Sequence, residues 1–169
     1  SVEVRVLHEA ILDMEKAKEA IIAYIGDPTN LRQLEPTPNL FHRVVGALQV
    51  IKHKIAADVL DKIRKFIKQY ILTRSLIPDQ SLLEALAESI SGIEYYMEAV
   101  VDNRTDTSNI LNITTEALQR LLTYGDIEDS QFFPSSTLDS SQLLQNEDTV
   151  AQETVQRDEN EQKVLEQEL

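Results

Sequence analysis

Residues 2–28 read VEVRVLHEAILDMEKAKEAIIAYIGDP and carry the clearest structural signal of the chain. The apolar side chains recur at steps of three and four, the spacing of one helix face: Val4, Leu7, Ala10, Ile11, Met14, Ala17, Ile21 and Ile25. Gly26 and Pro28 end this pattern, because glycine accepts a left-handed cap and proline cannot continue the helical hydrogen bonds. We therefore expect one long amphipathic helix over residues 2–25.

Four further segments show the same spacing. They predict helices over about 39–53, over about 55–75, from Pro78-Asp79 to about residue 100, and from Thr107 or Ser108 to Tyr124-Gly125. The core residues expected from them are Leu40, Phe41, Val44, Val45, Leu48 and Ile51, then Ile55, Val59, Ile63, Phe66, Ile67 and Tyr70, then Leu82, Leu86, Ile90, Ile93, Met97 and Val100, and finally Ile110, Ile113, Leu118, Leu121 and Leu122. Five helices with short connections predict an all-α, antiparallel helical bundle over residues 1–125.

The negative charge of the chain is concentrated at its end. Residues 1–125 carry 14 basic and 17 acidic side chains, whereas residues 126–169 carry 2 basic and 12 acidic ones, which gives the net charge of -13. The second region is rich in Ser, Gln and Glu and poor in aliphatic residues, a composition typical of flexible segments. We expect it to be an acidic linker, and the charge argues against nucleic acid as a partner.

Several classes of function are excluded or disfavoured by what the sequence lacks. There is no cysteine, so disulfides and thiolate metal sites are excluded and a cytoplasmic protein is expected. Four glycines leave little room for a nucleotide-binding loop, and no familiar catalytic motif is present. The spacing of His8, His42 and His53 does not demand a metal ion. We expect no cofactor, no metal and no insertion into a membrane, since no apolar run is long enough.

One segment does suggest chemistry, Phe41 to Leu48. Histidine-phosphotransfer (Hpt) helices carry an exposed histidine, a cation three residues later and a glycine four residues later, all on one side of the helix. His42 and Gly46 fit this pattern. Val45 stands where the cation is expected, so the motif is incomplete.

Three segments together resemble a known family: Gly-Asp-Pro-Thr-Asn-Leu-Arg-Gln-Leu (26–34), Phe-His-Arg-Val-Val-Gly-Ala-Leu-Gln-Val-Ile (41–51) and Ser-Ile-Ser-Gly-Ile-Glu-Tyr-Tyr-Met-Glu-Ala-Val (89–100). Over about residues 2–124 the chain looks like the FimL-like, Hpt-related amino-terminal region of ChpA/PilL-type hybrid chemotaxis histidine kinases. The resemblance implies a bacterial two-component phosphorelay that controls type IV pili and twitching motility. It also implies protein partners, namely kinase modules, response regulators or polar scaffold proteins.

Two interpretations of His42 remain open. In the first, His42 is a surface residue of a degenerate motif. In the second, it is the phospho-acceptor and draws on another cation, such as Arg43 or Lys54. Without a cation the phosphorylated state would lose a contact of roughly 1.5 to 3 kcal/mol. On this account, Val45→Lys should raise any phosphotransfer signal.

Two other features suggest binding surfaces. Residues 43–74 carry eight basic and two acidic side chains, a net of +6, which is either a solvated face or a site for an acidic partner or the acidic tail. The basic residues proposed for binding are Arg43, Lys54, Lys62 and Lys65. Tyr95 and Tyr96 are consecutive, so at least one lies near the surface and could belong to an interface.

These observations favour a scaffold and docking module without catalytic activity of its own. Two alternatives stay open: an active phosphotransfer domain with His42 as acceptor, and a free-standing FimL-like adaptor that forms a homodimer through an apolar helix face.

Overall fold

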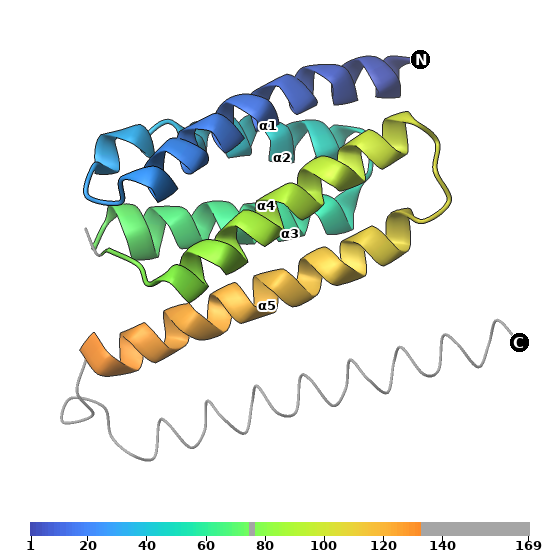
Figure 1. Ribbon diagram of the computed structural model, residues 1–169. Helices are drawn as coiled ribbons and strands as arrows, with labels where there is room; N and C mark the ends of the chain where they lie inside the picture. The colour runs from blue at the N-terminus through green and yellow to red at the C-terminus, as the bar shows by residue number, and fades with distance from the viewer. Residues whose placement is uncertain (75–76, 133–169) are drawn as a thin grey trace, which may run out of the picture. The chain divides into compact units, whose positions relative to one another are not determined.

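The computed structural model describes residues 1–74 and 77–132, and all regular structure within these residues is helical (Figure 1). In chain order the elements are α1 (Val2–Gly26), the short 3-10 turn η1 (Leu31–Gln33), α2 (Thr37–Val50), α3 (Lys54–Phe66), the π-helical segment η2 (Ile67–Leu72), α4 (Gln80–Val101) and α5 (Thr107–Phe132). The prediction of an all-α helical bundle is confirmed.

The first four helices form a closed bundle. α1 packs against α2 and α4, α2 packs against α3, and α3 packs against α4. Glycines let α5 approach this bundle from outside: a Cβ on Gly92 of α4 would lie 2.8 Å from Cγ2 of Thr114, and a Cβ on Gly125 would lie 2.9 Å from Cε2 of Phe66. α5 therefore packs across both α4 and α3, and residues 1–126 form one compact unit.

Capping interactions set several of the helix ends. The carboxylate of Asp79 accepts a hydrogen bond of 2.8 Å from the backbone N–H of Leu82, which starts α4 at the predicted place. At the end of α2, Lys52 adopts a left-handed conformation with φ 65°. The N–H of His53 then donates to the carbonyl of Leu48 at 2.8 Å and that of Lys52 to Gln49 at 3.1 Å, which is a Schellman motif. Asn103 ends α4 in the same way, with φ 54°.

Most of the predicted core residues are buried or partly buried, and two are exposed. Tyr24, Phe41 and Phe66 are among the largest fully buried side chains. Ile55 and Ile113, however, are 66% and 60% exposed, so their prediction as core residues was wrong. The reason is rotation of the helix. α3 turns Ala56, Ala57 and Leu60 inward, and α5 turns Thr114 and Ala117 inward, so each isoleucine lies on the flank of its helix.

Two helix boundaries also differ from the sequence predictions. The third helix changes to π-helical geometry at Ile67 instead of continuing as one α-helix to 75. The fifth helix does not end at Tyr124-Gly125 but reaches Phe132, so the first seven residues of the predicted linker belong to α5. The rest of that linker, 133–169, lies outside the described residues.

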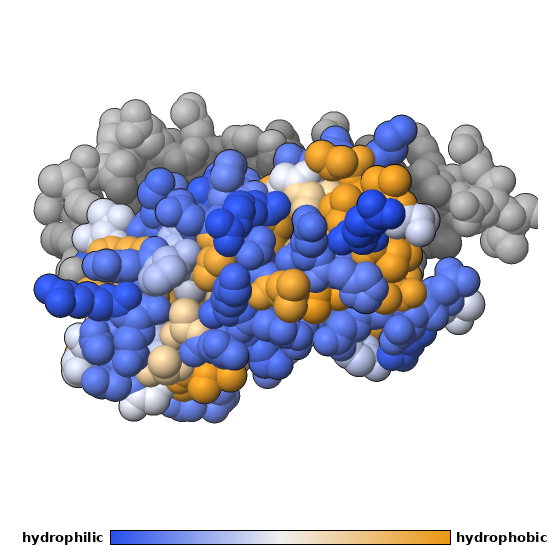
Figure 2. All heavy atoms as spheres, turned by 90° about the horizontal axis from the view of Figure 1, so that it is seen from above, coloured by the Kyte–Doolittle hydropathy of each residue, from blue (hydrophilic) through white to orange (hydrophobic). Residues whose placement is uncertain are grey.

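The surface above α1 is mixed rather than continuously apolar. In Figure 2, which looks onto this side, apolar side chains form separate patches among charged ones. Leu12 and Ile22 are the large apolar residues that α1 exposes in its middle and second half. None of the helices within residues 1–74 and 77–132 is long and apolar enough to cross a membrane.

Candidate functional site

The exposed side of α2 carries the phosphotransfer-like residues. His42 is exposed, and no hydrogen bond or ion pair joins it to another residue in the described part of the chain. Gly46 lies one turn later, and a Cβ placed on it would meet nothing within 4 Å. The imidazole and the open glycine therefore share an accessible surface, as the sequence pattern predicts.

Val45 lies on a different side of the same helix. Three residues correspond to about 300° of rotation, so position 45 is turned about 60° from His42, and this turn is toward the core. Val45 is only 5% exposed. A lysine here would have to bury its ammonium group or distort α2 to reach water. The sequence-based expectation that Val45→Lys restores a phosphotransfer cation conflicts with this burial.

The nearest cation in sequence is already engaged elsewhere. Arg43 donates from Nη2 and Nε to the two carboxylate oxygens of Asp13 on α1, at 2.9 and 3.2 Å. This bidentate contact raises the pKa of Arg43. Arg43 therefore connects α2 to α1, and its guanidinium group is engaged by Asp13.

The other basic residues proposed for binding lie on α3. Lys54, Lys62 and Lys65 are all exposed. Lys65 pairs with Asp61 at 3.2 Å, and Arg64 pairs with the same carboxylate at 2.9 Å. Desolvation raises the pKa of Asp61, but the contacts with the two cations together outweigh it, so the pKa is lowered. Lys54 and Lys62 have no polar partner within the described residues. None of the three lies on the same helix as His42.

The two neighbouring tyrosines of α4 point in different directions. Tyr95 is 47% exposed, and its hydroxyl accepts a hydrogen bond of 2.6 Å from Arg104. The guanidinium carbon of Arg104 also lies 5.0 Å from the centre of the Tyr95 ring. Tyr96 is buried, so only Tyr95 is placed to contact another molecule.

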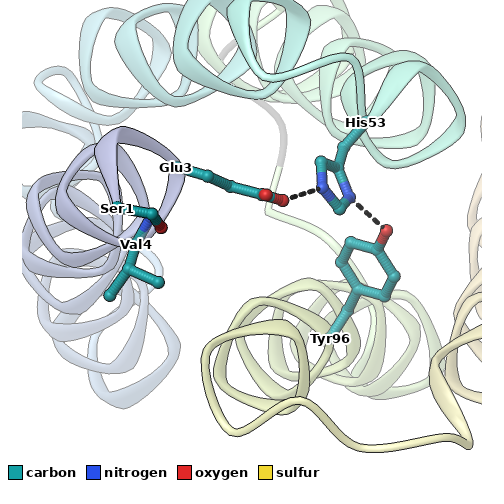
Figure 3. A network of polar contacts seen from close by, with 5 residues as sticks. All are labelled: Ser1, Glu3, Val4, His53 and Tyr96. Carbon is teal, nitrogen blue, oxygen red and sulfur yellow. Dashed lines mark hydrogen bonds and ion pairs between the residues drawn. The ribbon is translucent and has the colours of Figure 1, made fainter.

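A polar cluster that the sequence did not single out joins three parts of the bundle (Figure 3). His53 Nδ1 lies 2.7 Å from the hydroxyl of Tyr96, and His53 Nε2 lies 2.8 Å from a carboxylate oxygen of Glu3. Burial, together with the charge of Glu3, raises the pKa of Tyr96. Both ring nitrogens of His53 are occupied, so the cluster connects the α2–α3 turn with α1 and α4 rather than presenting a nucleophile.

The Schellman motif explains how this cluster forms. Lys52 in the left-handed region turns the chain so that His53, directly before α3, brings its partly buried ring to Tyr96 of α4 and Glu3 of α1. The sequence predicted that His53 ends the second helix, over about residues 39–53. A histidine directly after a helix end was the available signal, but the partners from α1 and α4 are 50 and 43 residues away in sequence.

Nothing else in the described part of the chain gathers reactive groups. Over residues 1–74 and 77–132, no three His, Asp or Glu side chains come together in a way that could hold a metal ion. The phosphotransfer-like face thus consists of one exposed imidazole beside an open glycine, with the nearest arginine paired to Asp13.

Comparison with known proteins shows the family of the chain. The family model described as the FimL C-terminal domain matches residues 1–118. The curated protein "Scaffold protein FimL" from Pseudomonas aeruginosa is 31% identical over 96 residues, which is 55% of this chain and 16% of that protein. The match therefore spans about one sixth of the relative, and no solved structure matches. Since the family model covers well over half of the sequence, the chain belongs to the FimL C-terminal domain family.

Proposed function

We propose that the chain is a docking module of a FimL-type scaffold and carries out no chemistry of its own. It acts through exposed helix faces that contact protein partners. By analogy with the resemblance found in the sequence, these partners are kinase modules, response regulators or polar scaffold proteins of a cytoplasmic chemotaxis-type system that controls type IV pili. The related Pseudomonas aeruginosa protein is described as a scaffold, which supports this role.

The observation that carries this proposal is the burial of Val45. A phosphotransfer helix needs a cation three residues after its histidine, and here that position lies in the core. Arg43, the neighbouring cation, is held by Asp13. A phosphoryl group on His42 would therefore lack a charge-assisted partner, which disfavours its transfer.

The competing function is phosphotransfer through His42, because the imidazole is exposed and Gly46 leaves its surroundings open. The test incubates the whole chain with a chemotaxis-type kinase core and ATP, next to a competent phosphotransfer module as the positive control. We expect no acid-labile phosphoryl group on the wild-type chain. A signal that disappears in His42→Gln would establish the competing function.

A cellular assay addresses the scaffold role directly. His42→Gln introduced into the parent gene should leave twitching unchanged, whereas deletion of residues 1–126 should impair it while the rest of the protein still accumulates. Equal loss from the histidine variant and from the deletion would contradict a docking role. The complete reading frame of the parent gene decides between a free-standing adaptor and a part of a larger kinase.

A further inference from the structure

The described unit has two helical regions whose net charges are equal in magnitude and opposite in sign. Residues 43–74 carry eight basic and two acidic side chains, a net of +6. Residues 79–102 carry six acidic and no basic side chains, a net of -6. The basic region runs from the second half of α2 through α3 and η2, and the acidic region is α4 with its caps, so the charges lie on different helices.

The acidic region presents one continuous exposed stripe, which we name the α4 face. Its residues are exposed at successive steps of four and three: Glu84, Glu88, Ser91, Tyr95, Glu98 and Asp102. Lys18 of α1 pairs with Glu94 at 3.1 Å on one side of the stripe, and Arg120 of α5 pairs with Glu88 on the other. The α4 face thus lies between α1 and α5, and an open groove of about 400 Å³ on its α1 side runs past Ser91, Tyr95 and Glu98.

The basic region presents a second exposed surface, which we name the α3 face. Its exposed residues are Lys54, Ile55, Asp58, Lys62, Lys65 and Lys68, four lysines and one carboxylate. Ile55 and Lys62 are seven residues apart and therefore point the same way, two helical turns from each other. Lys54, Lys62 and Lys68 have no polar partner in the described part of the chain, so their charges are available to another molecule.

Each face also has an apolar residue that the bundle leaves in water. Ile55 on the α3 face is 66% exposed, and Tyr95 on the α4 face is 47% exposed. Arg104 holds the Tyr95 ring and is itself paired with Asp106 at 2.6 Å, so the ring is fixed before any partner arrives. A fixed aromatic ring loses little conformational entropy on binding.

The spacing of the two faces is complementary. If Ile55 of one molecule packs on Tyr95 of another, Lys62 lies about 10.5 Å further along its helix. Seven residues from Tyr95 in one direction is Glu88, and seven in the other is Asp102. With parallel helices Lys62 meets Asp102, whereas with antiparallel helices it meets Glu88, which is already paired with Arg120.

We propose that the chain associates head to tail with further copies of itself, the α3 face of one copy docking on the α4 face of the next. The two faces belong to different helices, and α5 packs across both helices between them. The contact pairs two different surfaces, so a single contact leaves one free face on each copy. The proposal goes beyond the docking role above, because a scaffold module that stays monomeric would still dock its partners.

Electrostatics sets the conditions under which this association is observed. Residues 1–125 have a net charge of -3 and residues 126–169 add -10, so attraction between the two faces has to exceed a net repulsion between whole chains. Attraction between the faces is screened when the Debye length falls from about 10 Å at 0.1 M salt to about 3 Å at 1 M. We expect the whole chain to form oligomers at low salt when the protein concentration is raised to about 1 mM. These oligomers should dissociate at high salt.

Charge reversal on one face at a time tests the geometry. Lys54→Glu/Lys62→Glu reverses two charges of the α3 face, and Glu84→Lys/Glu98→Lys reverses two charges of the α4 face. Each variant alone should associate at least about tenfold more weakly, because like charges then meet. The controls are Lys16→Glu and Glu19→Lys on the outside of α1, which make one substitution of each kind, half the charge change of a double variant, and should leave association unchanged. Circular dichroism verifies that every variant is folded.

Mixing the two double variants gives the decisive result. Each retains the face that the other has lost, and the two reversed faces are also opposite in charge, so light scattering should show that mixing restores the association that neither variant shows alone. A wild-type chain that stays monomeric at low salt overturns the proposal. So does a mixture that remains monomeric, or a double variant that associates as well as the wild type.

The acidic tail is the competing occupant of the α3 face, since residues 126–169 carry 12 acidic and 2 basic side chains. Carbodiimide coupling, which joins lysine amines directly to neighbouring carboxylates, separates the two. We expect links from Lys54 or Lys62 to Glu84, Glu98 or Asp102 in the dimer band of mixed isotope-labelled chains. Links confined to carboxylates of residues 133–169 in the monomer band would overturn head-to-tail association.

Discussion

The Nδ1 atom of His53 and the hydroxyl oxygen of Tyr96 lie 2.7 Å apart and tie the turn between α2 and α3 to α4. His53 also contacts Glu3 near the start of α1, so one half-buried ring is in contact with three elements of the bundle. Because neighbouring helices are joined by short connections, contacts of this kind fix how the ends of the helices meet.

Removing the Tyr96 hydroxyl should therefore destabilise the bundle. We expect Tyr96→Phe to lower the free energy of unfolding by about 1 kcal/mol, since a half-buried imidazole loses its hydrogen-bond partner. Tyr95→Phe is the matched control: its hydroxyl is exposed, so the change should stay within about 0.5 kcal/mol. Urea denaturation measures both, and equal losses would show that the Tyr96 contact contributes nothing specific.

The two helical glycines Gly92 and Gly46 should respond oppositely to alanine. Gly92→Ala should cost about 1 to 3 kcal/mol, because its Cβ would press into the side chain of Thr114. Gly46→Ala should stabilise by about 0.5 to 1 kcal/mol, because the surrounding space is open and alanine favours the helix. Thermal denaturation distinguishes the two variants. A stabilised Gly92→Ala would mean that α4 and α5 do not approach closely.

The effect of an added lysine on the stability of the bundle should depend on its position in α2. Val45→Lys should lower the free energy of unfolding by about 3 kcal/mol, since position 45 lies in the core. Gln49→Lys places the same charge on the exposed side that His42 occupies, two turns later, and should change stability by no more than about 0.5 kcal/mol. Chemical denaturation compares them; a Val45→Lys variant as stable as the wild type would refute the burial argument.

Tyr24 should make the fold sensitive to alkaline pH. Its hydroxyl is buried without a hydrogen-bond partner in the described part of the chain, and burial raises its pKa from 10.0 to about 12. The folded chain then keeps a proton that the unfolded chain loses, so this contribution to stability is complete below pH 10 and is lost as pH rises toward 12.

Tyr24→Phe isolates this effect. At neutral pH the variant should be as stable as the wild type or slightly more so, because an unpaired hydroxyl is removed from the core. Between pH 10 and 12 its stability should fall less steeply than that of the wild type. Unfolding measured at a series of pH values gives both slopes, and parallel slopes would contradict the raised pKa.

The candidate site was only partly predictable from the sequence. The exposure of His42 and the open side of Gly46 followed from helical spacing. The pairing of Arg43 with Asp13 did not, because these residues are 30 positions apart and meet only when α2 packs on α1. The cluster around His53 was missed for the same reason, and also because Lys52 adopts a left-handed conformation that its side chain gives no reason to expect.

Local periodicity and capping determined the helices. The breaks at Gly26 to Pro28 and the cap at Asp79 act within a few residues, so the sequence alone identified the all-α class and most helix boundaries. Tertiary packing decided which flank of each helix is buried. Ile55 and Ile113 are as apolar as their buried neighbours, yet only the positions of the surrounding helices determine that they face solvent and that Val45 does not. Burial depends on contacts between distant segments, and these form only when the bundle has closed.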